Sequence, residues 1–394
     1  MQVAIIGAGI TGAPALRGSP GASCAWALRR ALGGGLRLTV FEMGRGAGGR
    51  AATRGTRELP GLGISHGAPV FHISLPEAQE LTELLEQRGA VERWAGTVGR
   101  VLADGATEAG GAASRGAAEG QPVYAGVPGM SAVANGILKA AEPFELKTNT
   151  TVSRLQRTTQ GVELLDSNGA TLGQFDWVVV TSLTAAHPRW TDVFGTPIPL
   201  AGVAEGSAPL QEAMASCAKA ESEPVQVAMA AWEGDGILAG LPFDVTYLDN
   251  PVVSKVVRGV SGGFSTVAVH STAEFARQHI NTHGSTGTVA RVAAPGAQSR
   301  TGLPESVVLE ALFSAFLAAA KPFLGAGLPE PRFGPHLHRW SSAFPGTALP
   351  GPVAADGVCL TGDFVGEPTG SVEAAMRGGV MGARALLATC EANL

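Results

Sequence analysis

The stretch AIIGAGITGAPALRGSPGASCAWALRRALGGGLRLTVFE, residues 4–42, decides the fold. Two short apolar runs rich in β-branched residues, AII and LRLTVF, lie near its ends, and the first leads directly into Gly7, Gly9 and Gly12. Glycines at this spacing let the chain turn tightly after a strand and let its backbone approach a pyrophosphate, which the N-terminus of the next helix stabilises. The stretch therefore predicts a strand–helix–strand unit that binds a dinucleotide at these three glycines.

Glu42, the acidic residue that ends the stretch, stands at an unusual distance from the glycines. Such an acid accepts hydrogen bonds from ribose hydroxyls and usually follows the motif by about 20 residues, whereas here the separation is 42 − 12 = 30. The surplus matches PALRGSPGAS, residues 14–23, in which Pro14 and Pro20 would each cost about 3 kcal/mol inside a helix. We interpret this segment as an insertion that bulges from the first helix, either a genuine loop or a misplaced exon boundary. The alternative is a helix that begins only at Ser23.

The composition is that of a globular protein that binds a small molecule. With 394 residues, 45% of them hydrophobic and 15% charged, the chain can bury a large core and is expected to form about two domains. A net charge of −5 and the lack of a dense Lys/Arg run argue against a nucleic-acid groove and against an anionic membrane surface. We therefore expect a small-molecule substrate as partner, and neither nucleic acid nor membrane.

The cysteines and the apolar runs bear on location. The four cysteines are scattered without a C-x-x-C pair, so neither a metal site nor a disulfide framework is expected. The best apolar run, ALFSAFLAAA, is shorter than the roughly 20 residues needed to cross a bilayer, and a fold that starts at residue 2 leaves no room for a signal peptide. These features favour the cytoplasm, with an organelle left open.

The rest of the chain alternates between helical and strand patterns. Apolar spacing predicts helices over residues 76–89 and 129–142, and a strand series expected to be antiparallel follows over 151–182. Strands and helices continue through 186–330 without a second glycine fingerprint. The closing strand GVCLTGD and the helix after it are expected to complete the sheet that begins at residue 2. The glycine-rich residues 104–120 are predicted to form a flexible surface loop.

The residues after Glu42 carry a resemblance to a known family. EMGRGAGGRAATR places Gly48, Gly49 and Arg50 just beyond the acid, and HGAPVF follows at 66–71. Acid, Gly-Gly-Arg and HGA in this order resemble the amine-oxidase superfamily of FAD proteins. Within it, SHGAPVFHI, VYAGVPGMSAVANGIL, VAVHSTAEFARQHI, HRWSSAFP and LTGDFVGEPTGSVEAAMRGGVMGARALL resemble renalase and its relatives over nearly the whole chain.

The resemblance implies an α/β fold with two domains. One is a Rossmann-type FAD-binding domain, similar to that of glutathione reductase, and the other is a discontinuous α+β substrate domain. We expect residues 1–75, 125–185 and 331–394 to form the first, and residues 76–124 and 186–330 to form the second.

The resemblance also implies roles for individual residues around a non-covalently bound FAD. The glycine motif and Glu42 would take the pyrophosphate and the ribose of the adenosine half. The further residues implied are Gly49 and Arg50 along the pyrophosphate, His66, Gly67 and Ala68 under the flavin ring, Val152 with main-chain hydrogen bonds to adenine, and Gly362 and Asp363 at the ribityl and phosphate groups. No cysteine in the closing motifs stands where it would link the flavin covalently.

The start of the last helix has a role that follows from its geometry. If GSVEAA begins a helix, the free N–H groups near Ser371, Val372 and Glu373 point toward whatever lies at its mouth. In such a fold that is the pyrimidine edge of the flavin, where hydride transfer places negative charge, and a helix terminus there stabilises the reduced ring by about 0.3–2 kcal/mol. The alternative is that Ser371 caps the helix and Glu373 complements its dipole without meeting a ligand.

The substrate side offers fewer signals. Trp340 in HRWSSAFP is the candidate catalytic residue, as a wall of the cavity over the flavin; equally, it could be a core aromatic. His270 is expected to pack near a helix start, with a site role as the alternative. An amine substrate would favour an aromatic cage, and the two tyrosines of the chain, Tyr124 and Tyr247, argue mildly against one.

These observations together predict an FAD-dependent oxidoreductase. It would accept a hydride from a small reduced substrate and pass the electrons to oxygen or another acceptor, and the resemblance suggests dihydro isomers of NAD(P)H as the substrate class. An amine oxidase or a desaturase-like flavoenzyme is one alternative. A flavin-binding protein without catalytic activity is another.

Overall fold

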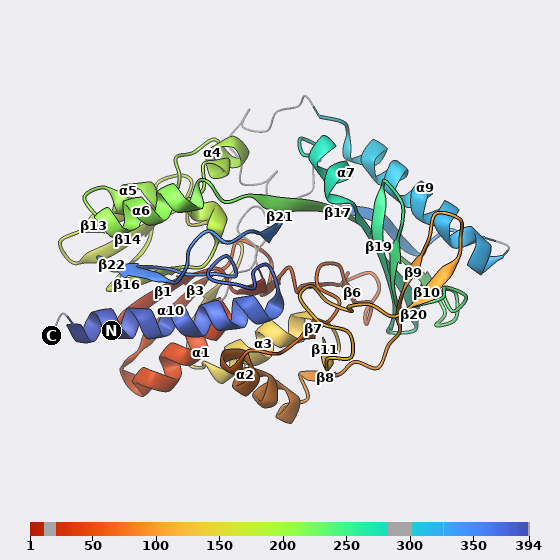
Figure 1. Ribbon diagram of the computed structural model, residues 1–394. Coiled ribbons are helices and arrows are strands. Elements are labelled where there is room, and N and C mark those ends of the chain that lie inside the picture. The colour runs from red at the N-terminus through yellow and green to blue at the C-terminus, as the bar shows by residue number, and fades with distance from the viewer. Residues whose placement is uncertain (12–20, 283–301, 326, 393–394) are drawn as a thin grey trace.

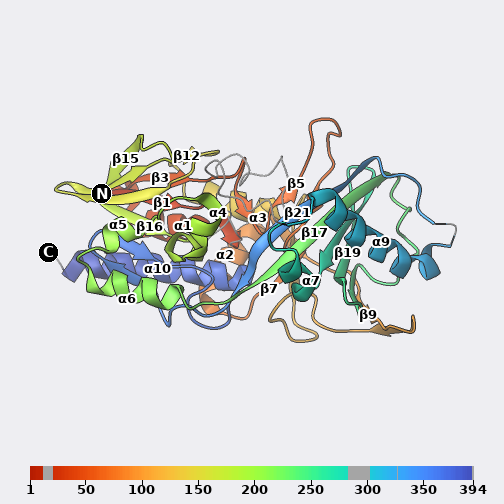
Figure 2. The same cartoon turned by 90° about the horizontal axis from the view of Figure 1, so that it is seen from above.

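The molecule consists of two lobes that lie side by side, each built on one large sheet (Figure 1). Two long strands, β17 (Ser222–Glu233) and β21 (Phe333–Pro345), extend from the junction into the second lobe, and both chain ends belong to the first (Figure 2). The computed structural model describes residues 1–11, 21–282, 302–325 and 327–392.

The sheet of the first lobe is parallel except at one edge. Its strand order is β12-β3-β1-β16-β23-β22, and β22 runs antiparallel to β23. β1 and β16 are apolar and buried along nearly their whole length, as expected for parallel strands covered on both faces. Because β23 pairs with β16 beside β1, the prediction that the closing strand completes the first sheet is confirmed. The strands are β1 (Gln2–Ile6), β3 (Arg37–Phe41), β12 (Glu145–Lys147), β16 (Trp177–Val180), β22 (Val353–Ala355) and β23 (Val358–Leu360).

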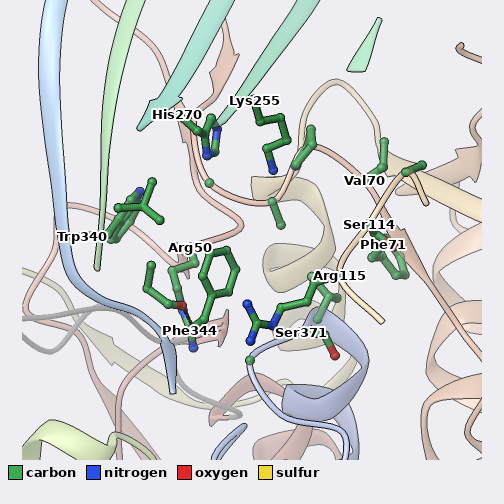
Figure 3. A pocket seen from close by; sticks show the side chains of 18 of the residues that line it. Arg50, Val70, Phe71, Ser114, Arg115, Lys255, His270, Trp340, Phe344 and Ser371 are labelled. Carbon is green, nitrogen blue, oxygen red and sulfur yellow. Dashed lines mark hydrogen bonds between the residues drawn. The ribbon is translucent and has the colours of Figure 1, made fainter. Parts of the chain in front are cut away.

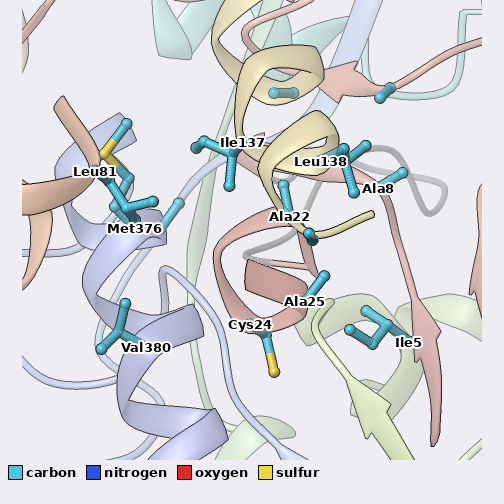
Figure 4. Packing of buried hydrophobic residues seen from close by; sticks show 14 of the residues in the cluster. Ile5, Ala8, Ala22, Cys24, Ala25, Leu81, Ile137, Leu138, Met376 and Val380 are labelled. Atoms are coloured by element: carbon cyan, nitrogen blue, oxygen red, sulfur yellow. The ribbon is translucent and has the colours of Figure 1, made fainter. Parts of the chain in front are cut away.

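Four helices pack together on one side of this sheet. Ala22, Ile137, Met376 and Leu81, one from each helix, lie in a single buried cluster with Ile5 of β1 (Figure 4). The helices predicted over 76–89 and 129–142 are confirmed. The four are α1 (Gly21–Leu32), α2 (Pro76–Gln87), α3 (Ser131–Ala140) and α10 (Val372–Ala392).

The other side of the first sheet carries a small antiparallel sheet and three short helices. Trp190, Val203 and Leu210 from these helices lie in one apolar cluster with Val178 of β16. The three strands pair antiparallel in chain order, as predicted for the series over 151–182. The prediction is wrong for the last strand of that series, β16, which pairs parallel with β1 and β23 in the first sheet. The elements are β13 (Arg154–Thr158), β14 (Gly161–Leu165), β15 (Thr171–Phe175), α4 (Arg189–Phe194), α5 (Ala201–Ala204) and α6 (Ala208–Cys217).

The second lobe is a seven-stranded mixed sheet in the order β10-β9-β18-β19-β20-β17-β21. One face packs on α9 (Glu305–Leu324), and the opposite face carries an apolar cluster that includes Ile64 of the first half of the chain. The further elements are β9 (Val98–Val101), β10 (Thr107–Ala109), β18 (Val245–Leu248), β19 (Val253–Ser261), β20 (Phe264–Ser271) and α7 (Ala273–Gln278).

Strand pairing and helix packing divide the chain differently from the predicted domains at several places. β21 falls in the predicted FAD-binding segment 331–394, yet it hydrogen-bonds to β17 of the second sheet. α2 and α4 to α6 fall in the predicted substrate segments 76–124 and 186–330, yet they pack on the first sheet. The apolar pattern of an element shows that it is buried but does not show which sheet it covers.

α9 is long and apolar enough to cross a membrane, judged by length and composition alone, and it is the one such helix in the part of the chain that the structure describes. The sequence estimate counted only the ten-residue run ALFSAFLAAA, whereas the helix extends beyond the charges on both sides. Val308, Leu312 and Phe316 pack one side of it on the second sheet, while 22% of its apolar window is buried in the protein.

Short strands connect the two lobes around the site. They are β2 (Gly9–Thr11), β4 (Gly48–Gly49), β5 (Thr53–Arg54), β6 (Ile64–Ser65), β7 (Phe71–His72), β8 (Val91–Arg93) and β11 (Val123–Gly126).

Candidate functional site

The first helix begins later than the glycine motif suggested. α1 starts at Gly21, so Gly21, Ala22 and Ser23 are buried helical residues and not part of a bulge. The interpretation of residues 14–23 as a bulge is therefore wrong for its last three residues. Gly12 and residues 14–20 lie outside the described residues.

Gly21 packs the helix against the first strand. A Cβ atom at this position would lie 1.8 Å from the Gly7 carbonyl oxygen and 2.9 Å from Cγ2 of Ile5, so no other residue allows this approach. This is the role of the last glycine in a dinucleotide-binding motif. The separation 42 − 21 = 21 also agrees with the usual distance of about 20 residues to the ribose acid. The spacing between Gly21 and Glu42 is visible in the sequence, but the glycine pattern favoured Gly12 for the packing role.

Glu42 and the glycines meet at the carboxyl ends of the first strands. Gly9 lies in β2, which pairs with β4 at Gly48 and Gly49. The buried Glu42 carboxylate accepts hydrogen bonds from the N–H groups of Ala8 at 3.0 Å and Gly44 at 2.6 Å. The structure thus brings the predicted residues Gly7, Gly9, Glu42 and Gly49 together at the edge where such folds bind dinucleotides.

The predicted adenine contact, Val152, lies at a small hollow on the same edge. Val152 is buried, and the hollow that it shares with Gly7, Phe41, Met43 and Thr150 has a volume of about 10 Å³. That is room for about one water molecule. An adenine ring would enter only after the Met43 side chain or its neighbours move aside.

A cavity of about 290 Å³ lies between the two lobes (Figure 3). Its first wall comes from the first lobe and its second wall from the face of the seven-stranded sheet. It collects most of the residues predicted to lie near a flavin ring or a substrate: Gly67, Ala68, Trp340, Ser371, Val372 and Glu373. Arg50, which was predicted along the pyrophosphate, also lines it.

The HGA segment forms part of the first wall. A Cβ atom at Gly67 would lie 1.8 Å from the Arg50 carbonyl oxygen, and the Ala68 N–H donates a hydrogen bond to that oxygen at 2.8 Å. Gly67 and Ala68 line the cavity as predicted, but the ring of His66 lies behind the wall, stacked on Trp340 at 5.4 Å between centroids. His66 therefore supports Trp340.

Arg50 and Asp363 were predicted at different parts of the cofactor, and the structure joins them in one buried ion pair. The guanidinium also donates to the carbonyl of Ala343, while its Nε has no hydrogen-bond partner among the described residues. Burial raises the pKa of Asp363, although the Arg50 charge acts in the opposite direction. The neighbouring Gly362 lies where α10 packs on the strand end, and its carbonyl oxygen lies 2.3 Å from where a Cβ atom at Gly378 would be.

The N-terminus of α10 opens into the cavity. Ser371, Val372 and Glu373 line it, and the Ser371 hydroxyl accepts a hydrogen bond from the Ala374 N–H at 3.0 Å. Ser371 therefore caps the helix. Within the described residues, the N–H groups of Val372 and Glu373 have no acceptor. The cap and the ligand-facing donors coexist at this helix end.

The Glu373 side chain ties α10 to the segment after β7. Its carboxylate accepts hydrogen bonds from the N–H groups of Ser74 and Leu75, and it lies 3.3 Å from Nε2 of His72. Burial alone would raise the pKa of Glu373, but these hydrogen bonds lower it below its usual value. The Nδ1 atom of His72 lies 3.0 Å from the hydroxyl of Ser114 in the glycine-rich loop.

Trp340 stands on β21 in the second wall. It is 3% exposed and lies in the apolar cluster of the second sheet, so the wall and core interpretations both hold. Its ring also contacts His338 at 4.1 Å between centroids. Its Nε1 is buried without a hydrogen-bond partner among the described residues.

A row of polar residues crosses the second sheet beside Trp340. Tyr247, Lys255 and His270 stand opposite one another on β18, β19 and β20, and all three line the cavity. Burial, and after it the Lys255 charge, lowers the pKa of His270 well below its usual value, so its ring is neutral. The site role considered for His270 is thus supported. No pattern in the sequence indicated Lys255 as a site residue.

The glycine-rich segment also contributes to the site, which the surface-loop prediction missed. Ala113, Ser114 and Arg115 line the cavity. The Arg115 guanidinium lies 4.5 Å from the ring centroid of Phe344 and 3.0 Å from the exposed carboxylate of Glu223. A segment without apolar periodicity contains no signal for such a position.

The unpartnered polar atoms around the cavity suit a flavin nucleotide. Arg50 Nε, His270 Nε2 and Trp340 Nε1 are all buried without partners among the described residues, and all three residues line the same cavity. Buried polar groups without partners are rare and call for a ligand or water. Arg50 Nε, Trp340 Nε1 and the free N–H groups of α10 present hydrogen-bond donors to a planar, polar-edged guest, and Nε2 of the neutral His270 ring donates or accepts according to its tautomer.

The comparisons with known proteins agree with this architecture. Residues 5–87 match the family model described as an NAD(P)-binding Rossmann-like domain. No curated protein sequence matches the chain.

Solved structures are similar over the whole chain. One is a protein from Exiguobacterium sp. 255-15 provisionally named protoporphyrinogen oxidase, at 11% identity and a TM-score of 0.60, covering 100% of this chain and 99% of that one. Putrescine oxidase bound to putrescine is 13% identical with a TM-score of 0.58, covering 98% and 99%. An oxidoreductase from Methanosarcina mazei is 13% identical with a TM-score of 0.58, covering 98% and 100%. The chain therefore has the mixed α/β fold of these oxidoreductases, with a Rossmann-type dinucleotide-binding domain at its start.

Proposed function

We propose that this protein is an FAD-dependent oxidoreductase that binds its flavin non-covalently in the cavity between the two lobes. One observation carries the proposal: three polar side-chain nitrogens without partners among the described residues and the N-terminus of α10 converge on a single cavity next to a dinucleotide-binding edge. The fold shared with solved oxidoreductases supports the same function.

The residues of the chain would divide the work as follows. Gly7, Gly21 and Glu42 would position the nucleotide half of FAD. Arg50 would bind the phosphates, and these would replace part of its contact with Asp363. The N–H groups of Val372 and Glu373 stabilise negative charge that develops at the pyrimidine edge, because a helix N-terminus carries partial positive charge. FAD, when bound, supplies the hydride acceptor. Trp340 closes the second wall and keeps water from the reacting face.

For the substrate we propose a small reduced molecule that gives up a hydride, with dihydro isomers of NAD(P)H as the candidate class and oxygen or another acceptor receiving the electrons. The support is the renalase resemblance of the motifs together with a cavity lining that, within the described residues, offers no free carboxylate base. Its acid, Glu373, is already bound by His72, Ser74 and Leu75. A dihydropyridine donor needs no such base.

An amine oxidase is the second candidate, and the similarity to putrescine oxidase favours it. The two tyrosines of the chain do not form a cage, however. Tyr124 packs on Phe71 at 5.7 Å between centroids, and the Tyr247 hydroxyl donates to the carbonyl of Ala112.

An anaerobic substrate screen tests the proposed reaction. The FAD-loaded protein is mixed with dihydronicotinamide isomers or with primary amines such as putrescine, and the loss of oxidised flavin absorbance is followed. We expect bleaching by a dihydronicotinamide. Bleaching by amines alone would replace this substrate class with the amine alternative.

A further inference from the structure

A β-bulge turns Lys255 toward the cavity. Val253 packs in the apolar cluster under α9, and regular alternation would send Lys255, two residues further along β19, to that same face. The register with β20 shifts between them, so that Val253 opposes Ser271 while Lys255 opposes the adjacent residue, His270. A bulge of this kind changes the direction of the side chains that follow it and is common beside active sites. Lys255 accordingly lines the cavity (Figure 3).

The ammonium group of Lys255 lacks an anionic partner. Across the part of the chain that the structure describes, no carboxylate lies within ion-pair distance of it. Burial lowers the pKa of Lys255 to about 8. A charged lysine held in a partly buried site without a counter-ion is costly, and a strand irregularity that places it there points to a ligand that supplies the missing charge.

The other groups that face Lys255 do not supply that charge. His270 on β20 is neutral, and burial raises the pKa of Tyr247 on β18, so its hydroxyl stays protonated. Arg115 on the opposite loop adds a second positive charge, which only the exposed Glu223 offsets among the described residues. Glu373 at the far wall is bound by His72 and the segment after it. Among the described residues, the cavity lining around Lys255 therefore contributes positive charge and no carboxylate that is free to pair with the lysine.

We infer that the cavity at Lys255 is an anion subsite, in which the Lys255 ammonium binds a carboxylate or phosphate group of the substrate and Arg115 adds positive charge from the opposite loop. The inference rests on the proposed function, because the subsite lies where the substrate of the flavin would enter. It makes the substrate an acid and disfavours a cationic amine, which would face the Lys255 ammonium.

Three probes of similar size separate charge from shape. Benzoate, phenyl phosphate and neutral benzamide are titrated into the FAD-loaded protein while the flavin absorbance is followed. We expect one or both anions to perturb the spectrum at concentrations at least about tenfold lower than benzamide, since a hydrogen bond to a charged group contributes about 1.5–3 kcal/mol. The ratio of benzoate to phenyl phosphate shows which anion the subsite prefers.

Variants assign the effect to the two residues. Lys255→Met is expected to weaken the binding of the anions at least about tenfold, Lys255→Arg to retain it, and Arg115→Met to weaken it by a smaller factor. Benzamide binding and FAD binding should stay as in the wild type. Lys321→Met removes an exposed lysine of α9 and is the matched control.

The pH dependence provides a separate check. In the wild type the binding of the anions should weaken as the pH rises above about 8, because the Lys255 ammonium loses its proton. In Lys255→Arg it should stay constant over this range, because a guanidinium remains charged.

Equal binding of the anions and benzamide, or unchanged binding of the anions in Lys255→Met, would overturn the inference. Slower flavin reduction in Lys255→Met with neutral and acidic donors alike, while the anions still bind, would also overturn it, because the lysine would then act on the flavin. Calorimetric titration of the two anions into FAD-free protein separates the two proposals. Anion binding there, in a protein that takes up no FAD, would contradict the proposed cofactor and leave the subsite intact.

Discussion

Two glycines at the site hold backbone segments at distances that exclude any side chain. Gly21 lies against the Gly7 carbonyl, and Gly67 lies against the Arg50 carbonyl. The first contact packs α1 against the nucleotide-binding edge, and the second shapes the first wall of the cavity. At both positions the close approach explains why the chain uses glycine, and a single methyl group tests it.

Gly67→Ala should lower the free energy of unfolding by about 1–3 kcal/mol, because the new methyl group overpacks against the Arg50 carbonyl. FAD binding should weaken as well, because the new methyl group displaces the first wall of the cavity. Urea denaturation and an FAD titration measure the two effects. Gly34→Ala is the control, because a Cβ atom there meets nothing within 4 Å. If Gly67→Ala and Gly34→Ala show the same stability and the same FAD binding, this contact does not determine the first wall of the cavity.

The ion pair of Arg50 and Asp363 is buried, so removing one partner leaves the other charge buried without a counter-ion. Asp363→Ala should cost about 3–5 kcal/mol of unfolding free energy in the FAD-free protein. Glu80→Ala breaks the exposed pair with Arg30 and should cost less than about 1 kcal/mol. Chemical denaturation at neutral pH compares them. A cost for Asp363→Ala as small as that for Glu80→Ala would contradict the burial of this pair.

Among the elements, α10 depends on Glu373 for its attachment to the segment after β7. The pKa of this carboxyl is lower in the folded protein than its ordinary value of 4.5. A depressed pKa means that the carboxylate stabilises the fold fully above pH 4.5 or so, and that this contribution disappears as the pH falls through the folded value.

Glu373→Gln should therefore be less stable than the wild type at pH 7, and the difference should shrink as the pH falls below about 4.5. Thermal unfolding followed by circular dichroism from pH 7 to pH 3 measures this. Glu86→Gln, on the exposed face of α2, should show no such trend. A gap between Glu373→Gln and wild type that stays constant down to pH 3 would contradict the ionised contact.

The first helix provides a test by deletion. Removing residues 12–20 joins Thr11 to Gly21 and leaves GAGITGASCAWAL, which retains the packing glycine and the helix register. Removing residues 14–23 leaves GAGITGACAWAL, which lacks one helical residue after the glycine and so turns the apolar face by about 100°. The first variant should bind FAD and the second should not. The reverse result, read from flavin absorbance, would return the packing role to Gly12.

At the scale of the whole molecule, the sequence predicted the layers better than the walls of the site. The first sheet was predictable because strongly β-branched runs stand next to glycines at both ends of the chain. The position of Lys255 in the cavity was not predictable, because a β-bulge turns its side chain to the opposite face from the one that regular alternation assigns. Arg115 was not predictable either, because it lies in a segment without apolar periodicity. The pairing of β21 with β17, about 110 residues away in sequence, cannot be predicted from the residues of β21 alone.

The central claim is that the cavity between the lobes takes up FAD, and the absorbance spectrum of the purified protein after incubation with FAD tests it most directly. We predict that the gel-filtered protein retains about one flavin per chain, with bands shifted from those of free FAD and a cofactor that acid releases. A folded protein that elutes colourless and leaves the spectrum of added FAD unchanged would contradict the account.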